Sequence, residues 1–460
     1  MLFSSLTFIY IFLPITLLLC EVSFGKLRSL ALFVMSFLFY FWGEPKYSIL
    51  MLVSILNGYL GGILIEKSNY RKPVASIFIA FQFLLLGIFK YTDFFIDTVN
   101  SLTGSDFKLL KIALPIGISF YSFQIISYLI DVYRKDEVAE KNFIDFGAYV
   151  TMFPQLIAGP IVRYTSIREE MKNYHITIEN FSSGITRFMI GLAKKVILAD
   201  NIVGLATKLE QVNDGSFIVY WVIGIVYTLQ IYLDFSGYSD MAIGLGKMMG
   251  FTFHENFNYP LESKSITEFW RRWLISLSTW LKDYIYIPLG GSRCSTKRWI
   301  INILLVWSFS GLWHGASWNF VIWGVYFGFW LILEKLVLKQ FVKKDCWINN
   351  LVTIILVVIS FIIFTYSDLT VLGNTLKGLV NFKHLSVNSA ALYEITSYSF
   401  LLILCILGST SLPKKIYEKI ELETKGYIKV LTPLFNIVLL VLITSFLIQS
   451  SVHPFLYFRF

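Results

Sequence analysis

The sequence predicts an all-α, polytopic membrane protein, and three observations lead to this prediction. Of the 460 residues, 56% are hydrophobic and only 15% are charged, whereas soluble domains usually carry about 25% charged residues. Apolar runs of roughly 18 or more residues, long enough to cross a bilayer, recur along the chain. The basic residues, which give a net charge of +9, lie in short loops between these runs, and this is the pattern of the positive-inside rule. We therefore expect a multi-pass protein of the cell membrane that contacts lipid and does not bind nucleic acid.

Five apolar runs in the first 130 residues are expected to be transmembrane helices, at 2–20, 30–42, 47–65, 74–89 and 112–130. The first has no basic segment before it and no cleavage site of small residues, so we interpret it as a retained helix and not as a signal peptide. Basic clusters at Lys26, Lys67 and Arg134 follow alternate runs. The positive-inside rule places these clusters in the cytoplasm and the N-terminus outside the cell.

The apolar segment 143–162 differs from these runs because basic residues flank it on both sides. It also contains Pro154 and the turn Ala158-Gly159-Pro160, which a straight transmembrane helix disfavours. We therefore predict a re-entrant segment. Such a segment is tolerated only where protein or water surrounds its free backbone groups, so it also indicates a cavity.

The second half of the chain contains further apolar runs, expected as helices at 183–208, 217–233, 241–253, 351–364, 398–407 and 431–447. We expect a break at 234–240, between the second and third of these helices. Residues 268–284 predict an amphipathic helix, with polar residues on one face and aromatic residues on the other, that lies along an interface or lines a cavity. Residues 414–429 are expected to form a basic cytoplasmic loop.

The run 299–333 contains no acidic or basic residue other than His314, and basic clusters at Arg293 and Lys343 flank it. Since both flanks are basic, we predict a hairpin whose turn lies near His314. Each arm has roughly 17 residues, or about 25 Å of helix, which is short for a complete crossing. We therefore expect His314 to lie within the membrane.

The sequence shows no internal repeat and no soluble domain, so residues 1–460 are predicted to form a single transmembrane domain. We expect about ten or more transmembrane helices, with re-entrant and interfacial helices, around a central cavity. The four cysteines are scattered without a Cys-x-x-Cys pair, and His254-Glu255 lacks a second histidine four residues later. The sequence thus indicates neither a disulfide framework nor a metal site.

His314 is the candidate catalytic residue. A neutral imidazole accepts a proton near neutral pH, and histidine is the usual general base for activating a hydroxyl. An ionisable residue within an apolar run is energetically expensive, which favours a functional role. The neighbouring small residues Gly311, Gly315 and Ala316 would let a substrate or another backbone approach closely. The alternative is a structural histidine that is hydrogen-bonded to a helix backbone.

Two other groups of charged residues have both a functional and a structural interpretation. Arg271 and Arg272 could bind the phosphates of a cofactor that enters from the cytoplasm. Equally, they could pair with Glu268 and Asp283 or contact lipid headgroups. Asp234 and Asp240 could hold a basic partner, polarise a histidine or cap helix ends.

Several motifs occur in a fixed order from one end of the chain to the other. They are Met1-Leu2-Phe3-Ser4-Ser5 with Phe12-Leu13-Pro14, residues 114–120, residues 153–161, residues 234–240, residues 269–291, Leu312-Trp313-His314-Gly315 and residues 455–460. Together they make the chain similar to the membrane-bound O-acyltransferases. The resemblance is to the bacterial alginate O-acetyltransferase branch and, more distantly, to the D-alanyl transfer protein of teichoic acid synthesis.

The resemblance implies that His314 is the hallmark histidine of the family and that the chain is an acyltransferase. The expected reaction moves a short acyl group, acetyl in this branch, from a cytoplasmic thioester such as acetyl-CoA toward an extracytoplasmic polysaccharide. No permanently bound cofactor is expected, and a partner acyltransferase, outside the membrane or anchored in it, is expected to receive the acyl group. One position departs from the branch, because the segment 270–273 is usually followed by a second histidine and here by Leu274.

Two competing functions remain open at this point. In the first, the chain is a solute or acyl transporter, and His314 and the aspartates gate a solute without forming a bond. In the second, the chain is an acyltransferase of the same fold that moves D-alanyl or a longer acyl chain to teichoic acid, lipid or protein. Loss of acyl modification with intact donor uptake would favour an enzyme over a transporter.

The charge pattern makes a testable prediction about topology. The basic loop that contains Lys415 is expected in the cytoplasm, and the mixed-charge stretch that contains Asp97 is expected outside the cell. Single cysteines introduced as Lys415→Cys and Asp97→Cys should therefore react with a membrane-impermeant thiol reagent from opposite sides. Labelling of both positions from the same side would contradict the predicted topology.

Overall fold

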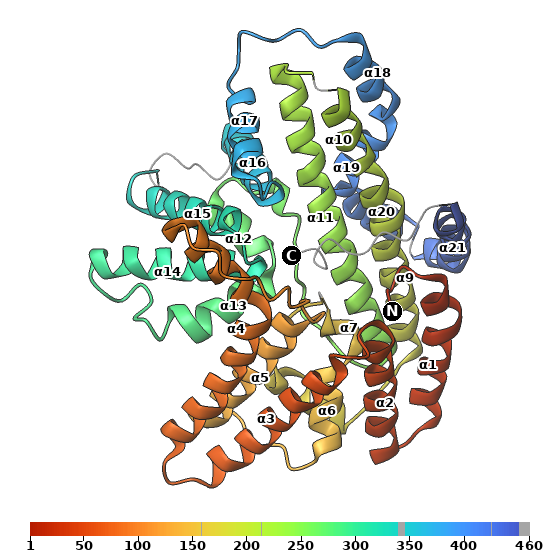
Figure 1. The fold of residues 1–460 in the computed structure, drawn as a ribbon. Coiled ribbons are helices and arrows are strands. Elements are labelled where there is room, and N and C mark those ends of the chain that lie inside the picture. Colours follow the sequence, from red (N-terminus) through yellow and green to blue (C-terminus); the bar gives the residue numbers. More distant parts are fainter. Residues whose placement is uncertain (158, 213, 339–345, 425, 450–460) are drawn as a thin grey trace. The chain divides into compact units, whose positions relative to one another are not determined.

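The computed structural model describes the chain from residue 1 to residue 449, except for residues 158, 213, 339–345 and 425 (Figure 1). In this part of the chain it consists of helices and connecting segments, without a strand, which confirms the predicted all-α class. The basic cluster at Lys343, the turn residue Ala158 and the motif at 455–460 lie outside the described residues.

Seven of the described helices are long and apolar enough to cross a membrane. They are α2 (Lys26–Gly43), α3 (Ser48–Lys67), α4 (Arg71–Thr103), α11 (Phe217–Met248), α15 (Trp318–Leu336), α16 (Trp347–Thr365) and the segment Lys429–Gln449, which contains α21 (Thr432–Gln449). The count rises to eight if α18 (Ser389–Ser397) and α19 (Ser399–Gly408), which are bent by 51°, form one broken span.

This number is below the about ten spans expected from the sequence, because several apolar runs form helices that are short for a bilayer. The first run forms the helix Phe8–Val22, made of η1 (Phe8–Phe12) and α1 (Leu13–Val22). The fifth run forms α5 (Ile118–Arg134), which has 17 residues. The chain is nonetheless a multi-pass membrane protein, as predicted.

The internal contacts group the chain into two compact units, each made of two stretches of sequence. Unit 1 comprises Met1–Ile185 and Ala242–His254, and unit 2 comprises Thr186–Met241 and Glu255–Phe460. Two helices, α9 (Ile178–Ala193) and α11, begin in one unit and end in the other. That all 460 residues form one domain stays a prediction.

Helices α3, α4 and α5 of unit 1 pack through small and polar residues. A Cβ atom at Gly58 of α3 would lie 2.9 Å from the side chain of Ile125 of α5, and one at Gly62 would overlap the Tyr128 hydroxyl. The buried Gln82 side chain of α4 donates a hydrogen bond to the Ser122 hydroxyl of α5 at 2.9 Å. Close backbone approach and interhelical hydrogen bonds are the usual means of joining helices in a membrane.

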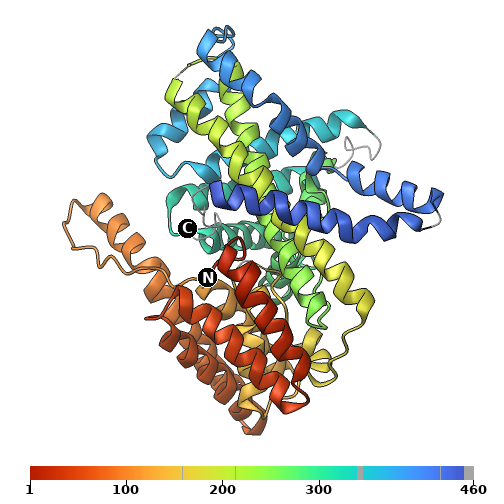
Figure 2. The ribbon, with the colours of Figure 1, turned by 90° about the vertical axis from the view of Figure 1, so that its right-hand side faces the viewer.

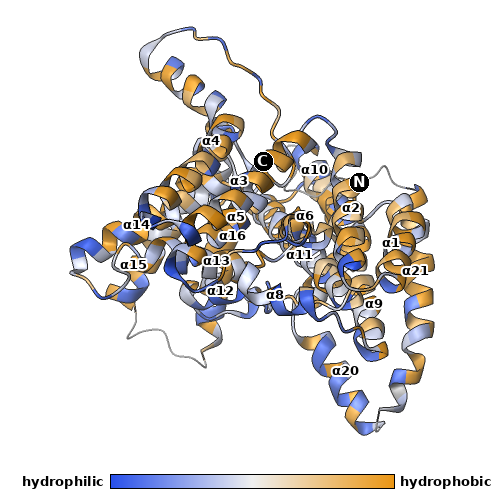
Figure 3. Cartoon of the chain, turned by 90° about the horizontal axis from the view of Figure 1, so that it is seen from below, coloured by the Kyte–Doolittle hydropathy of each residue, from blue (hydrophilic) through white to orange (hydrophobic). Residues whose placement is uncertain are grey.

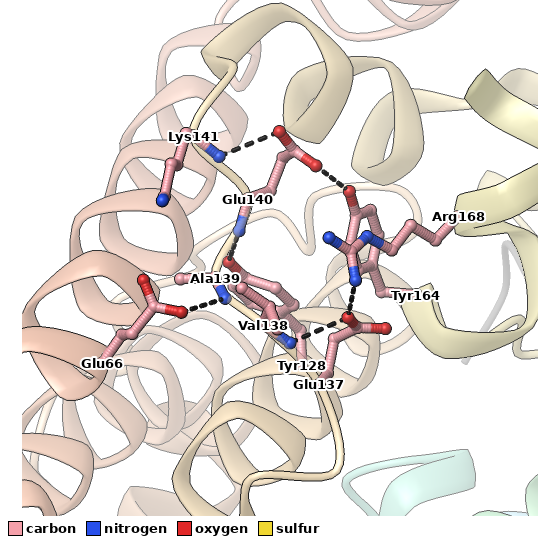
Figure 4. Close-up of polar contacts among 9 residues, drawn as sticks. All are labelled: Glu66, Tyr128, Glu137, Val138, Ala139, Glu140, Lys141, Tyr164 and Arg168. Atoms are coloured by element: carbon pink, nitrogen blue, oxygen red, sulfur yellow. Dashed lines mark hydrogen bonds and ion pairs between the residues drawn. The ribbon is translucent and has the colours of Figure 1, made fainter.

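The connection between α5 and α6 (Phe143–Thr151) is held by side chains from several helices (Figure 4). The backbone N–H of Glu140 donates to the Tyr128 hydroxyl at 2.9 Å, and the carboxylate of Glu140 accepts a hydrogen bond from Tyr164 of α8 (Tyr164–Lys172). Arg168 of α8 forms an ion pair with Glu137. The connection is therefore fixed to both α5 and α8.

The segment 143–162 does not form a straight helix, in agreement with the prediction. Helix α6 ends at Thr151, and only the single turn of α7 (Phe153–Leu156), with Pro154 in its first turn, follows. A helix of nine residues spans about 14 Å, roughly half of a bilayer core. The residues of both helices after Asp145 are buried, so protein surrounds the interrupted backbone.

The boundary between the fourth and fifth predicted spans differs from the prediction. Helix α4 continues to Thr103 instead of ending near residue 89, and residues 104–115 are not helical (Figure 2). The predicted fifth span begins six residues late because Pro115 and Gly117 precede it, and Gly117 adopts a φ of 74°. Glycine adopts this left-handed backbone conformation without steric cost, and the conformation lets the chain turn into the start of α5.

The predicted break at 234–240 is wrong, because α11 passes through these residues without interruption. The small and acidic residues instead form a contact with α9 and η2 (Lys194–Ala199). A Cβ atom at Gly237 would lie 2.7 Å from the carbonyl oxygen of Gly191. The carboxylates of Asp234 and Asp240 form ion pairs with the two lysines of η2, so their charges do not require an exposed turn.

The prediction of one continuous helix at 268–284 is wrong. Helix α12 (Ile266–Arg272) and helix α13 (Ile275–Leu281) are separated at Leu274, whose φ of 42° lies in the left-handed region. Asn256 holds this break, because its carbonyl and side-chain oxygens accept the backbone N–H groups of the first two residues of α13, at 2.9 and 3.1 Å. The stabilising residue belongs to a preceding loop, so helical periodicity could not reveal the break.

The remaining helices of unit 2 complete the described chain. They are α10 (Asp200–Val212), η3 (Pro260–Glu262), η4 (Lys282–Tyr286), α14 (Thr296–His314), α17 (Leu369–Gly378), α20 (Leu412–Glu423) and η6 (Tyr427–Leu431). The predicted basic loop 414–429 is largely the helix α20, which has no buried residue and carries both acidic and basic side chains. Figure 3 shows the contrast between this hydrophilic helix and the hydrophobic α21.

Candidate active site

The predicted hairpin around His314 is present as α14 and α15, which are joined by residues 315–317. Three glycines allow the two helices to touch through their backbones. A Cβ atom at Gly311 would overlap the carbonyl oxygen of Phe320, one at Gly324 would overlap that of Trp307, and one at Gly315 would overlap the ring of Phe320. Small residues at these positions therefore determine how closely the arms approach each other.

His314 is the last residue of α14 and is only 2% exposed. Three aromatic rings surround its imidazole, each nearly perpendicular to it. The distances between ring centroids are 5.0 Å to Trp313, 4.9 Å to Trp323 and 5.4 Å to Phe364. This aromatic enclosure excludes water and gives the imidazole an apolar environment, in which a charged form is costly.

Asn319 connects the hairpin to the end of α16. It is 1% exposed, and its side-chain amide donates hydrogen bonds to the carbonyl oxygens of Ile363 and Phe364 at 3.2 and 2.9 Å. These carbonyls belong to the last turn of α16, where helical partners are missing. The amide therefore satisfies both carbonyls and fixes Phe364, which forms one side of the aromatic enclosure.

Helix α12, which carries both candidate arginines, is attached to the same hairpin. Its Trp270 packs on Trp307 and Trp323, with ring centroids 4.4 and 5.6 Å apart. Its first two backbone N–H groups donate to the carboxylate of Glu334 in α15, at 2.8 and 3.2 Å. Packing and a charged cap thus place Arg271 and Arg272 on an element that contacts the helices around His314.

The structure separates the two arginines, for which the sequence left two interpretations. Arg272 forms an ion pair with Glu268 one turn earlier, at 2.6 Å, as the structural interpretation proposes. Arg271 is exposed and forms no ion pair with any residue that the structure describes. Of the two, only Arg271 therefore has its guanidinium group available to bind an external phosphate.

Asp234 and Asp240 hold basic partners, which was one of the three interpretations of these residues. Asp234 pairs with Lys195 at 2.7 Å. Asp240 pairs with Lys194 at 2.8 Å and with Arg187 at 2.6 Å. Neither carboxylate caps a helix end, since both lie inside α11.

Arg187, Lys194 and Lys195 were not predicted as partners of these carboxylates. The signal was present, because basic residues within the apolar run 183–208 require acidic partners in a membrane. These pairs connect α9 and η2 to α11, and the carboxylate of Glu255 extends the network by binding Arg187 through two hydrogen bonds at 3.0 and 2.6 Å. This network is therefore a structural support in unit 2.

No group of three or more histidine, cysteine, aspartate or glutamate side chains comes together among the described residues in a way that could hold a metal ion. The four cysteines are free thiols. The described chemistry of this region is thus that of an imidazole, an exposed guanidinium group and an apolar aromatic enclosure. Such a set fits proton transfer beside an acyl group.

Comparison with known proteins decides the family. Residues 134–373 match the model of the membrane-bound O-acyltransferase family. The protein "Probable alginate O-acetylase AlgI" of Pseudomonas putida is 38% identical over the full length of both chains. The chain belongs to the membrane-bound O-acyltransferase family. It is therefore a membrane-bound acyltransferase, and the transporter interpretation is set aside.

Other relatives in the family support this assignment. The "Probable alginate O-acetylase AlgI" of Pseudomonas aeruginosa is 42% identical over 83% of this chain and 75% of its own length. The "Peptidoglycan O-acetyltransferase" of Helicobacter pylori is 31% identical over 98% of this chain and 90% of its own length. The family match includes His314, Arg271 and Arg272, but the roles of these residues stay predictions.

The backbone contact in the hairpin makes a prediction about Gly324. In Gly324→Ala the new methyl group overlaps the Trp307 carbonyl oxygen, so the helices must separate and the aromatic enclosure must open. We expect a loss of about 1–3 kcal/mol in stability, as for other overpacked sites, and reduced acyl transfer. Thermal unfolding of the purified protein and an acyl-transfer assay measure the two effects.

Gly328→Ala is the matched control, because it lies one turn further along the same helix. Its new methyl group would lie 3.3 Å from the side chain of Leu304 and 3.4 Å from that of Trp307, a tight contact that side chains can relieve. This variant should retain stability and activity. Equal behaviour of the two variants would show that the close approach at Gly324 does not position the site.

Proposed function

We propose that this acyltransferase moves an acetyl group from a cytoplasmic thioester, such as acetyl-CoA, toward a polysaccharide outside the cell. Two relatives that align over most of the chain are named an alginate O-acetylase and a peptidoglycan O-acetyltransferase. These names support acetyl as the acyl group and a polysaccharide as the acceptor. The observation that carries the proposal is the imidazole of His314, buried in an aromatic enclosure at the turn of a membrane hairpin.

In this proposal His314 is the general base. Its neutral imidazole takes the proton from the attacking hydroxyl group while the hydroxyl oxygen forms a bond to the thioester carbonyl carbon. When the carbon–sulfur bond breaks, the thiolate leaves and receives that proton from the imidazolium. The imidazole returns to its neutral form, which its apolar environment favours, because a lasting charge there would cost several kcal/mol.

The aromatic enclosure supplies the second requirement of acyl transfer. Water competes with the acceptor hydroxyl for the thioester and would hydrolyse it. The rings of Trp313, Trp323 and Phe364 around the imidazole leave an apolar surface that holds an acyl chain and keeps water out. The proposed function therefore depends on the packing of the enclosure as well as on the imidazole.

Arg271 is proposed to bind the phosphates of the thioester donor, since it is the exposed arginine of the two on α12. A guanidinium group binds phosphate oxygens in pairs. In this relay the attacking hydroxyl group belongs to an acyltransferase partner, outside the membrane or anchored in it, which receives the acyl group and completes its transfer to the polysaccharide. This partner is inferred from the resemblance to the alginate O-acetyltransferase branch.

The general-base role predicts the effect of replacing His314. His314→Gln conserves the side chain's size and hydrogen-bonding capacity but cannot accept the proton, so acyl transfer should fall by about 10²–10⁴-fold. The measurement is the acetyl content of the exported glycan in a strain that carries the variant, with protein abundance checked by immunoblot. If His314 were only structural, glutamine could replace its hydrogen bond, and wild-type acetylation would remove His314 from catalysis.

The different environments of the two arginines predict different effects on donor binding. Arg271→Ala should weaken binding of the acyl thioester about 10- to 100-fold, the usual range for a lost charge-assisted hydrogen bond, with normal membrane abundance. Arg272→Ala should leave donor affinity unchanged, because it removes only a partly exposed pair with Glu268, worth about 0–1 kcal/mol. Donor titration of both purified variants makes the comparison, and equal affinities would contradict the role of Arg271.

A further inference from the structure

A cleft of about 880 Å³ lies in unit 2 and has no part in the chemistry of His314 described above. It is lined by residues from the start of α11, the end of α17 and the segment 379–388 that connects α17 to α18. Figure 1 shows the course of these elements. The side chains that matter for its chemistry are Tyr220, Asn374, Lys377, Asn381, Lys383 and His384. We call it the 377–384 cleft.

The segment 379–388 has little regular structure, yet hydrogen bonds attach it firmly to the start of α11. The backbone N–H of Phe217 donates to the carbonyl oxygen of His384 at 2.8 Å. The indole N–H of Trp221 donates to the carbonyl oxygen of Leu379 at 3.1 Å. The ring of Phe382 packs on that of Phe217, with centroids 4.9 Å apart. The cleft is therefore preorganised, which lowers the entropic cost of binding a ligand.

Asp214 holds the other end of this segment. One oxygen of its carboxylate accepts the backbone N–H of Asn388 at 2.6 Å, and the other accepts that of Ser216 at 2.8 Å. Desolvation alone would raise the pKa of Asp214, but these hydrogen bonds hold the pKa below its usual range. Both oxygens already accept hydrogen bonds, so Asp214 anchors the segment.

The cleft carries positive charge without a carboxylate among its described lining residues. Lys377 and Lys383 are exposed, and neither forms an ion pair with a described residue. His384 lies beside them and is also exposed. Charge-assisted hydrogen bonds from such cations to carboxylate or phosphate groups are stronger than those between neutral groups, so the cleft favours an anionic ligand.

The other lining groups favour a sugar chain over a small molecule. Pockets for small molecules enclose most of the ligand, whereas Asn374, Asn381 and Phe382 of this cleft are exposed. Each amide both donates and accepts hydrogen bonds, as neighbouring sugar hydroxyls require. The ring of Phe382 is 67% exposed and offers an apolar face to the C–H groups of a sugar ring.

The expected topology places this cleft outside the cell. It follows the candidate span α16 and precedes the bent pair α18 and α19, so it lies on the side opposite the segment 414–429, which is expected in the cytoplasm. Lysines on the external side run against the positive-inside tendency. Two external lysines in one preorganised cleft are therefore better explained by a ligand than by topology.

We propose that the 377–384 cleft binds a carboxylate-bearing polysaccharide. The lysines hold the carboxylates, the asparagines hold the hydroxyls, and Phe382 contacts a sugar ring. The inference rests on the proposed function, because it makes this polymer the polysaccharide that finally receives the acyl group. It also assigns this chain a direct part in binding the polymer.

Binding of oligosaccharides to the purified full-length protein tests the proposal. The probes are an oligomer of six to ten hexuronic acid residues, the matching neutral oligomer of glucose, and vesicles that contain an anionic phospholipid. We expect the uronic acid oligomer to bind in a salt-sensitive manner, and about tenfold or more tightly than the glucose oligomer, as two charge-assisted contacts allow. The double variant Lys377→Gln/Lys383→Gln should lose this difference.

Two control variants make the result specific. Lys414→Gln/Lys415→Gln removes the same charge from the exposed helix α20 and should bind the uronic acid oligomer like the wild type. His314→Gln should also bind it normally, since His314 lies outside the cleft. Binding by this variant without acyl transfer separates the cleft from the catalytic proposal.

Three outcomes would overturn the proposal. The first is no binding of the uronic acid oligomer by the wild type. The second is equal loss of binding in the two double-lysine variants, which would indicate a general effect of net charge. The third is binding of anionic vesicles through Lys377 and Lys383 without binding of the oligomer, which would assign the cleft to lipid headgroups. In each case acyl transfer by the wild type would leave the proposed function intact.

Discussion

The backbone contact between α14 and α15 is the constraint on which the candidate site depends. At Gly311 and Gly324 the two helices approach so closely that a methyl group has no room. The hydrophobic effect does not drive helices together in a lipid environment, so association there depends on close packing and hydrogen bonds. The glycines supply the packing, and the turn of the hairpin then places His314 at the end of α14 among rings from α15 and α16.

A second constraint is that charges in an apolar region must be paired. Arg187, Lys194 and Lys195 meet Asp234 and Asp240 at 2.6–2.8 Å. Such buried pairs add little net stability relative to apolar residues, but removal of one partner leaves an uncompensated charge and costs about 3–5 kcal/mol. The pairs therefore determine which faces of α9, η2 and α11 meet. The two lysines are consecutive and lie in a π-helical turn, a geometry that is common at functional positions.

The sequence predicted those features that composition and charge spacing determine directly. The membrane class, the hairpin at 299–333 and the interrupted segment near Pro154 follow from local patterns, and the structure contains them. The errors at 234–240 and 268–284 have a common cause. Gly237 and Asp240 resemble a turn, and Glu268 and Arg272 resemble one face of a long helix, but distant residues decide both cases. Lys194 and Gly191 keep α11 continuous, and Asn256 interrupts the chain at Leu274.

The pattern of ion pairs also explains why Arg271, Lys377 and Lys383 are the cations to which ligands are assigned. Lys194 and Lys195, which lie between α9, α10 and α11, have carboxylate partners, and Arg272 has Glu268. Arg271, Lys377 and Lys383 are exposed and form no ion pair with the described residues. Each is attached to a well-packed element. Arg271 follows Trp270, Lys377 lies at the end of α17, and Lys383 lies in the segment bound to α11. A fixed cation without an internal partner can bind an external anion without first breaking an ion pair. The charge distribution therefore favours a phosphate ligand at α12 and a carboxylate ligand in the 377–384 cleft.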